Sequence, residues 1–165
     1  MVLELRNHST SLRAVEPDSL TEGGFRVRIA VIDGQGGGIG KIITEKIRRQ
    51  LPEVEIIALG TNALATSLML KAGANDGASG ENAVIVNAPL VDLILGSLSI
   101  LIANSMLGEF TPRMANAVAE SKALKLVIPL TRSPVEVIGA AGEPLPHQVD
   151  LLIQRLKQIM VDREK

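Results

Sequence analysis

The chain reads Gly34-Gln35-Gly36-Gly37-Gly38-Ile39-Gly40 one residue after an apolar run, residues 27–32, and just before a segment whose apolar residues recur at helical spacing. This order predicts a strand, a glycine loop and the start of a helix. Few β-carbons obstruct such a loop, so its backbone N–H groups can surround an anion at the positive end of the helix dipole. The sequence therefore predicts where a phosphate-bearing ligand binds, but it does not identify a reaction.

Strand and helix patterns alternate along the rest of the chain. Strands are predicted at residues 54–59, 91–95, 124–130 and 135–138, with a short strand or loop at 74–80. Helices are predicted from the glycine loop to Pro52 and at 61–72, 98–107, 111–121 and 147–161, and residues 81–88 favour a helix over a strand. Thr61 and Thr111 are the expected N-caps, and Gly73 is the expected C-terminal cap. The alternation predicts a three-layer α/β fold with a mainly parallel, Rossmann-like sheet.

The length of the chain predicts one domain. A chain of 165 residues with 46% hydrophobic content is long enough for a single core, which we place in residues 27–165. Residues 1–26 are polar, lack a sustained period and are interpreted as an N-terminal tail. A second interpretation places this tail outside the native protein, because Glu22-Gly23-Gly24 can be encoded by codons that resemble a bacterial ribosome-binding site, with Val27 as a GTG start.

The composition excludes several classes of function. The net charge is -1, with 17 basic and 18 acidic residues and no basic stripe, so we expect no nucleic-acid partner. The absence of Cys excludes a disulfide framework and a thiol nucleophile, and we expect a cytoplasmic protein. Phe25 and Phe110 are the only aromatic residues, so a flavin ring cannot stack on several aromatic faces. Only His8 and His147 are present, and we expect no metal site.

Residues 83–107 are apolar over about the length of a bilayer span. Polar residues, Gly and Pro interrupt this segment, at Asn87, Pro89, Asp92, Gly96 and Asn104. A helix–strand–helix passage that is buried in an α/β core explains both the apolar character and the interruptions. We therefore expect no membrane partner.

The glycine loop departs from two common ligand motifs. The phosphate loop of nucleoside triphosphatases requires Gly at position 35 and Ser or Thr at position 42, where this chain has Gln35 and Ile42. The dinucleotide motif Gly-x-Gly-x-x-Gly, started at Gly34, requires Gly at position 39, where this chain has Ile39. The loop therefore predicts a bound phosphate without identifying its carrier.

The spacing Gly34-x-x-x-Gly38-Ile39-Gly40 resembles the loop of the short-chain dehydrogenases, which are nicotinamide-dependent Rossmann enzymes. This resemblance implies NAD(P) or another nucleotide as a ligand. The Tyr-x-x-x-Lys pair that those enzymes use as acid and base is excluded, because the chain has no Tyr. The acidic residue that dinucleotide sites place about 20 residues further on is also missing, since Thr61 and Asn62 stand at that corner.

Ligands of an open parallel sheet bind beyond the carboxyl ends of its strands. Such positions in this chain are Asp33, Thr61, Asn62, Gly96, Ser97, Thr131 and Arg132. With the loop, the predicted binding residues are Gly34, Gln35, Gly36, Gly37, Gly38, Ile39, Gly40, Thr61, Asn62, Gly96, Ser97 and Asn104. Helix capping explains Thr61 and Asn62 at least as well, and an Asp-Gly turn explains Asp33.

Two acidic residues are candidates for catalysis. Glu109 follows an apolar stretch, and an apolar setting would raise its pKa towards neutrality. Asp33 is a candidate base or ribose contact. The alternatives are a plain loop position for Glu109 and a turn for Asp33.

Three stretches of the chain read IAVIDGQGGGIGK at residues 29–41, ALGTNA at 58–63 and ANSMLGE at 103–109. Together they resemble a family of small bacterial Rossmann-like proteins of unknown function. The resemblance extends from about Val27 to the C-terminal helix. It implies no catalytic residues, because the family has no assigned activity, but it makes the three stretches a candidate single site.

Three functions remain open from the sequence. The first is a protein that binds a nucleotide or dinucleotide through residues 34–40. The second is a non-catalytic interaction module, in which residues 98–107 and Phe110 form the interface of a homodimer and the glycine loop is only a turn. The third is an enzyme that acts on a small phosphorylated metabolite through Glu109 or Asp33.

Overall fold

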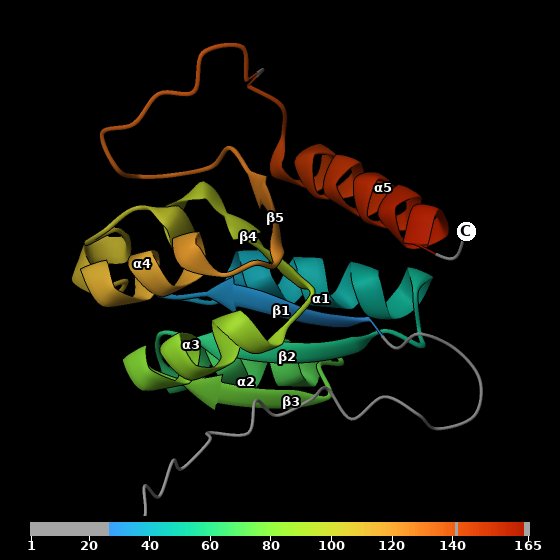
Figure 1. Ribbon diagram of the computed structural model, residues 1–165. Helices are drawn as coiled ribbons and strands as arrows, with labels where there is room; N and C mark the ends of the chain where they lie inside the picture. Colours follow the sequence, from blue (N-terminus) through green and yellow to red (C-terminus); the bar gives the residue numbers. More distant parts are fainter. Residues whose placement is uncertain (1–26, 141, 164–165) are drawn as a thin grey trace, which may run out of the picture.

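The computed structural model describes residues 27–140 and 142–163, so the predicted tail at 1–26 lies outside the described residues. Five strands of the described part form one sheet in the order β3-β2-β1-β4-β5, and each neighbouring pair is parallel (Figure 1). The strands are β1 (Arg28–Asp33), β2 (Glu55–Gly60), β3 (Asp76–Ser79), β4 (Leu93–Ser97) and β5 (Leu124–Ile128). The predicted α/β class with a parallel sheet is confirmed.

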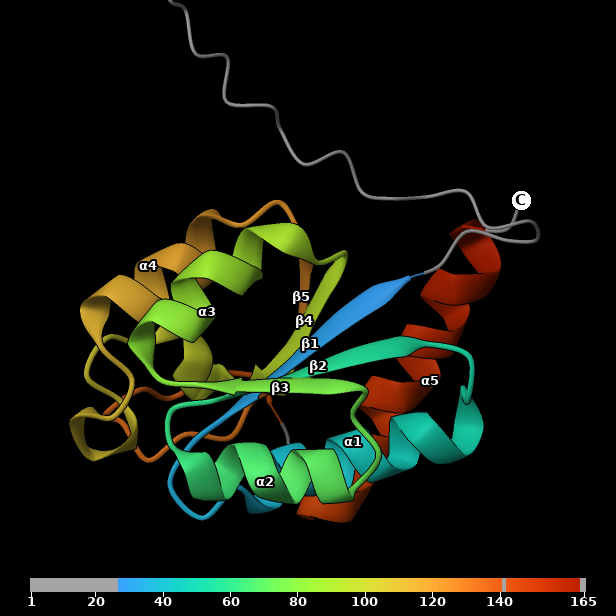
Figure 2. The ribbon, with the colours of Figure 1, turned by 90° about the horizontal axis from the view of Figure 1, so that it is seen from below.

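Helices cover both faces of this sheet. One face carries α1 (Gly38–Gln50), α2 (Ala63–Lys71) and α5 (Leu145–Arg163), and the other carries α3 (Glu81–Asn87) and α4 (Pro112–Glu120) (Figure 2). Three 3-10 turns complete the described elements, η1 (Ala88–Leu90), η2 (Leu98–Leu101) and η3 (Met106–Gly108). The structure therefore has the predicted three layers.

The central strand β1 contacts both helical layers. Ile29 and Val31 belong to the core that includes residues of α1 and α5, whereas Ala30 and Ile32 belong to the core that includes residues of α3 and α4. All four side chains are at most 1% exposed. A parallel strand that is covered on both faces requires consecutive apolar residues, and this explains the unbroken run before the glycine loop.

Two of the three predicted helix caps agree with the structure. The Thr111 side chain accepts a hydrogen bond from the first turn of α4, and Gly73, which has a φ of 110°, follows α2. The predicted N-cap Thr61 is wrong, because α2 begins one residue later. Its N-cap is Asn62, whose Oδ1 accepts the N–H of Ala65 at 2.9 Å.

Residues 98–107 do not form the predicted helix. Only the short η2 turn and the start of η3 fall within this range, and the chain adopts positive φ at Asn104, Met106 and Leu107. Ile100 is buried, Leu101 and Met106 pack against the same core, and Phe110 is 0% exposed within this core beside α3 and α4. Phe110 is therefore not available for the predicted dimer interface.

The segment between β5 and α5 also differs from its prediction. Residues 135–138 do not form a strand, because no neighbouring strand pairs with them beyond β5 in the described sheet. The last helix begins at Leu145 rather than at residue 147. Pro146 lies in its first turn, where Pro is favoured, and this position indicates the earlier start.

Candidate functional site

The glycine loop lies between β1 and α1 at the carboxyl edge of the sheet. β1 has β2 on one side and β4 on the other, so the order of the strands reverses at this point. Ligands of open α/β sheets bind at such a switch point. The loop residue Gly37 is the N-cap of α1 and has a φ of 66°, which glycine adopts without strain.

A cleft of about 530 Å³ opens beside this loop. Its walls come from the loop and α1, from the end of β4 and η2, from the segment after β5, and from the start of α5. Seven of the predicted binding residues line it: Gly34, Gln35, Gly36, Gly37, Gly38, Ile39 and Ser97. The structure therefore places the loop and the end of β4 at one cleft, as the sequence predicts.

Five other predicted binding residues, Gly40, Thr61, Asn62, Gly96 and Asn104, do not line the cleft. Gly40 and Gly96 are buried instead, and a Cβ on Gly96 would lie 2.7 Å from the carbonyl oxygen of Ile32. The N–H of Asn104 donates to the carbonyl of Phe110 at 2.8 Å. These contacts give Gly96 and Asn104 a role in the fold. A role of the five residues in binding stays a prediction.

The cleft also contains residues outside the predicted binding set. Asp33, Thr131 and Arg132 were expected at strand ends and do line it. Five further lining residues had no signal in the sequence analysis, namely Ile42, Ser99, Met106, Leu130 and Leu145. The helix predicted at 98–107 gave no reason to expect Ser99 at a strand end. The predicted start of the last helix at residue 147 likewise left Leu145 outside that helix.

The backbone amides of the loop divide into two groups. The N–H of Gly37 donates to the carbonyl of Gly34 at 2.9 Å and closes the turn. Within the described residues, the N–H groups of Gly36 and Gly38 have no hydrogen-bond acceptor. They belong to residues that line the cleft, so two donors at the N-terminus of α1 are available there to an anion.

The buried side chain of Asp33 fixes the shape of the glycine loop through hydrogen bonds to its backbone. Its side chain is 5% exposed, its Oδ1 accepts the N–H of Gly34 at 2.8 Å, and its Oδ2 accepts the N–H of Gly40 at 2.6 Å. Burial raises the pKa of Asp33 above 3.8, although the amides of Gly40, Gly34 and Ile39 act against that rise. A carboxylate whose two oxygens both bind backbone amides holds the loop, which agrees with the turn interpretation.

The replacement Asp33→Asn should change how stability depends on pH. Because the pKa is higher in the folded protein than the unfolded value of 3.8, the contribution of Asp33 becomes less favourable as pH rises from 3.8 through the raised pKa. The free energy of unfolding of the wild type minus that of Asp33→Asn should therefore fall across that window. Urea unfolding of both proteins at several pH values measures this difference. A difference that is constant with pH would contradict the raised pKa of Asp33 in the folded protein.

Glu109 lies on the β2 side of the glycine loop and contacts two of the three stretches. Its Oε2 accepts hydrogen bonds from the N–H of Gln35 at 2.8 Å, from Thr61 Oγ1 at 2.5 Å and from Asn62 Nδ2 at 2.9 Å. The Thr61 hydroxyl, with the Gln35 amide and the Asn62 side chain, holds the pKa of Glu109 below 4.5. The predicted rise towards neutrality is wrong, because Glu109 is exposed and surrounded by donors. This removes the raised pKa on which the catalytic candidacy of Glu109 rested.

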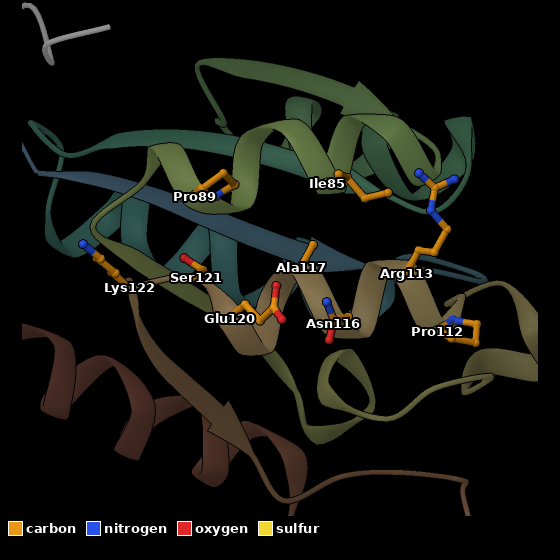
Figure 3. Close-up of a pocket in the computed structure, with 9 residues that line it drawn as sticks. All are labelled: Ile85, Pro89, Pro112, Arg113, Asn116, Ala117, Glu120, Ser121 and Lys122. Carbon is orange, nitrogen blue, oxygen red and sulfur yellow. The ribbon is translucent and has the colours of Figure 1, made fainter. Parts of the chain in front are cut away.

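A second hollow lies between α3 and α4, away from the glycine loop. Figure 3 shows its lining, from Ile85 and Pro89 to Arg113 and Lys122, and its volume is about 990 Å³. Its charged side chains are exposed, and the Nη1 of Arg113 pairs with the Oε1 of Glu81 at 2.8 Å. The cleft at the glycine loop lies at the switch point of the sheet, where ligands of open α/β folds bind, and it is therefore the stronger candidate for a ligand.

Two further observations concern membranes and metals. No helix in residues 27–140 and 142–163 combines the length and apolar character that crossing a bilayer requires. Over the same ranges, no three His, Asp or Glu side chains gather closely enough to hold a metal ion.

Comparisons with known proteins add a family and a solved structure. No curated protein matches the sequence. The crystal structure of a universal stress protein in complex with cAMP aligns with a TM-score of 0.38 and 16% identity, over 63% of this chain and 98% of that chain. The family model described as a domain of unknown function (DUF3842) matches residues 28–161, which confirms the predicted membership in an uncharacterised family. The chain therefore belongs to the family described as a domain of unknown function (DUF3842).

Proposed function

We propose that this protein binds a mononucleotide, with a phosphate at the N-terminus of α1. The observation that carries the proposal is the pair of free N–H groups, on Gly36 and Gly38, that borders the 530 Å³ cleft. Donors at a helix N-terminus favour an anion through direct hydrogen bonds and through the helix dipole.

The remainder of the cleft supports a ligand that is partly charged and partly apolar. Arg132, which lines the cleft from the segment after β5, supplies a positive charge that can pair with a phosphate. The hydroxyl-bearing residues Ser97, Ser99 and Thr131 also line the cleft. Ile39, Ile42 and Leu145 provide an apolar wall that can cover a base. The volume of the cleft lies within the range of about 300–1,000 Å³ that is typical of small-molecule sites.

The β2 side of the loop favours a mononucleotide over a dinucleotide. Dinucleotide folds bind the adenosine ribose through an acid at the end of the second strand. Here Thr61 and Asn62 stand at that end, and both donate to Glu109, which brings the segment after η3 against the loop. The segment that contains Glu109 therefore covers the β2 side of the glycine loop, where the second nucleotide of a dinucleotide would bind.

A ligand screen by thermal shift tests the proposal. AMP and ADP should raise the Tm, because a ligand at about 100 times its Kd stabilises the folded state by roughly 2.7 kcal/mol. Adenosine, which lacks the phosphate, is the matched control and should produce a much smaller shift. Equal shifts with adenosine and AMP, or none with any nucleotide, would contradict a phosphate site. Since the protein has no Trp and no Tyr, a copurified nucleotide would also dominate its near-ultraviolet absorption.

Association as a homodimer and a cytoplasmic location stay predictions from the sequence. With Phe110 buried, the segment expected at the dimer interface retains Leu107, which is 92% exposed. Size-exclusion chromatography with light scattering tests the association, and a monomer at high concentration would contradict it.

A further inference from the structure

One oxygen of Glu109 occupies a cluster of three hydrogen-bond donors. The donors are the backbone N–H of Gln35, the hydroxyl of Thr61 and the side-chain amide of Asn62, at 2.8, 2.5 and 2.9 Å from Oε2. They come from the glycine loop and from the end of β2, whereas Glu109 comes from the segment after β4. Donors that converge on a single anionic oxygen form an anion site, whichever molecule supplies the anion.

The segment that supplies Glu109 has an unfavourable backbone. Asn104, Met106 and Leu107 have φ values of 60°, 56° and 58°, a region that side chains with a β-carbon rarely adopt. Burial does not compensate at Leu107, which is 92% exposed. The hydrogen bonds of Glu109 therefore help to hold this segment, and an anion that replaced the carboxylate would allow it to relax.

This donor cluster adjoins the proposed phosphate site. Gln35, whose N–H binds Glu109, directly precedes Gly36, whose N–H is free. Gln35 has a φ of 49°, and successive amides in such a turn form a concave anion site. Met106, from the segment of Glu109, lines the same cleft. Two neighbouring anion positions therefore lie along one loop, one of them filled by the protein itself.

We propose that Gln35, Thr61 and Asn62 form a second anion subsite, which the second phosphate of a diphosphate ligand occupies after displacing Glu109. The proposal rests on the proposed function, since the first phosphate binds at Gly36 and Gly38. Glu109 then competes with the ligand, and its removal strengthens the binding of a diphosphate more than that of a monophosphate.

Calorimetric titration of the full chain with inorganic phosphate and inorganic pyrophosphate tests the proposal. Glu109→Gln keeps the length of the side chain and removes its charge, so the Kd for pyrophosphate should fall by roughly tenfold, and that for phosphate by less than about threefold. The matched control is Glu53→Gln, which removes the same charge at an exposed position beyond the far end of α1. This control should leave both affinities unchanged.

A double variant tests the donors themselves. Adding Thr61→Val to Glu109→Gln removes one hydroxyl donor without changing the shape of the side chain, and it should abolish most of the gain for pyrophosphate. Circular dichroism of each variant confirms that the fold is retained.

The outcomes separate the two proposals. If the wild type binds phosphate but Glu109→Gln binds pyrophosphate no more tightly than the wild type, the second subsite is wrong and the proposed function stands. An equal gain for phosphate and pyrophosphate also overturns the subsite, because it would reflect net charge alone. If neither protein binds phosphate, pyrophosphate or ADP, the proposed function fails and the subsite fails with it.

Discussion

Gly38→Leu is expected to weaken the binding of ADP by at least roughly 100-fold while the protein keeps its fold. Gly38 lines the cleft, begins α1 and does not have a positive φ, so its backbone accepts a leucine. A Cβ at this position meets no other atom within 4 Å. The leucine side chain therefore extends into the open volume beside the free N–H of Gly38, which the phosphate must approach.

Titration calorimetry with ADP measures this loss, and circular dichroism together with the Tm checks the fold. Gly38→Ala is the matched control, because a methyl group leaves most of the volume free, and its Kd should change by less than about tenfold. A folded Gly38→Leu protein that binds ADP as tightly as the wild type would exclude the N-terminus of α1 as the phosphate site. The same result would contradict the proposed function.

Local patterns were sufficient to predict the central part of the fold. The run before the glycine loop is apolar because β1 is covered on both faces, and this requirement leaves a signal in the sequence itself. The caps at Thr111 and Gly73 are local as well, since each depends on residues within one turn. The position of the glycine loop could also be predicted from local sequence, because it lies directly between the apolar run of β1 and the helical pattern of α1.

The site was harder to predict, because its contacts join distant segments. Glu109 reaches the glycine loop only because residues 104–108 turn back through positive φ, which no spacing of apolar residues indicates. Its pKa was therefore predicted in the wrong direction, from apolar neighbours in sequence rather than donors in space. The three stretches of the family resemblance do lie together, since Glu109 contacts both Gln35 and Asn62, and that they form one binding site stays a prediction.

Gly37→Ala is expected to lower the free energy of unfolding by about 3 kcal/mol, which combines the cost of a left-handed backbone with that of overpacking. Gly37 has a φ of 66°, and a Cβ there would lie 2.6 Å from the Cα of Ala65. The clashing atom belongs to the backbone of α2, so no side-chain rotation can relieve the contact. Urea unfolding measures the loss through the midpoint of the transition.

Gly38→Ala is again the matched control, since the two glycines are adjacent and receive the same methyl group. Its free energy of unfolding should stay within about 0.5 kcal/mol of the wild type, because the first turn of α1 accepts alanine and no atom lies within 4 Å of the new Cβ. Equal losses in the two variants would mean that the loop does not pack against α2 as described. The contrast also separates the two roles of the loop. Gly37 sets the distance between α1 and α2 and so shapes the anion site through the fold, whereas Gly38 leaves the space that the anion itself needs.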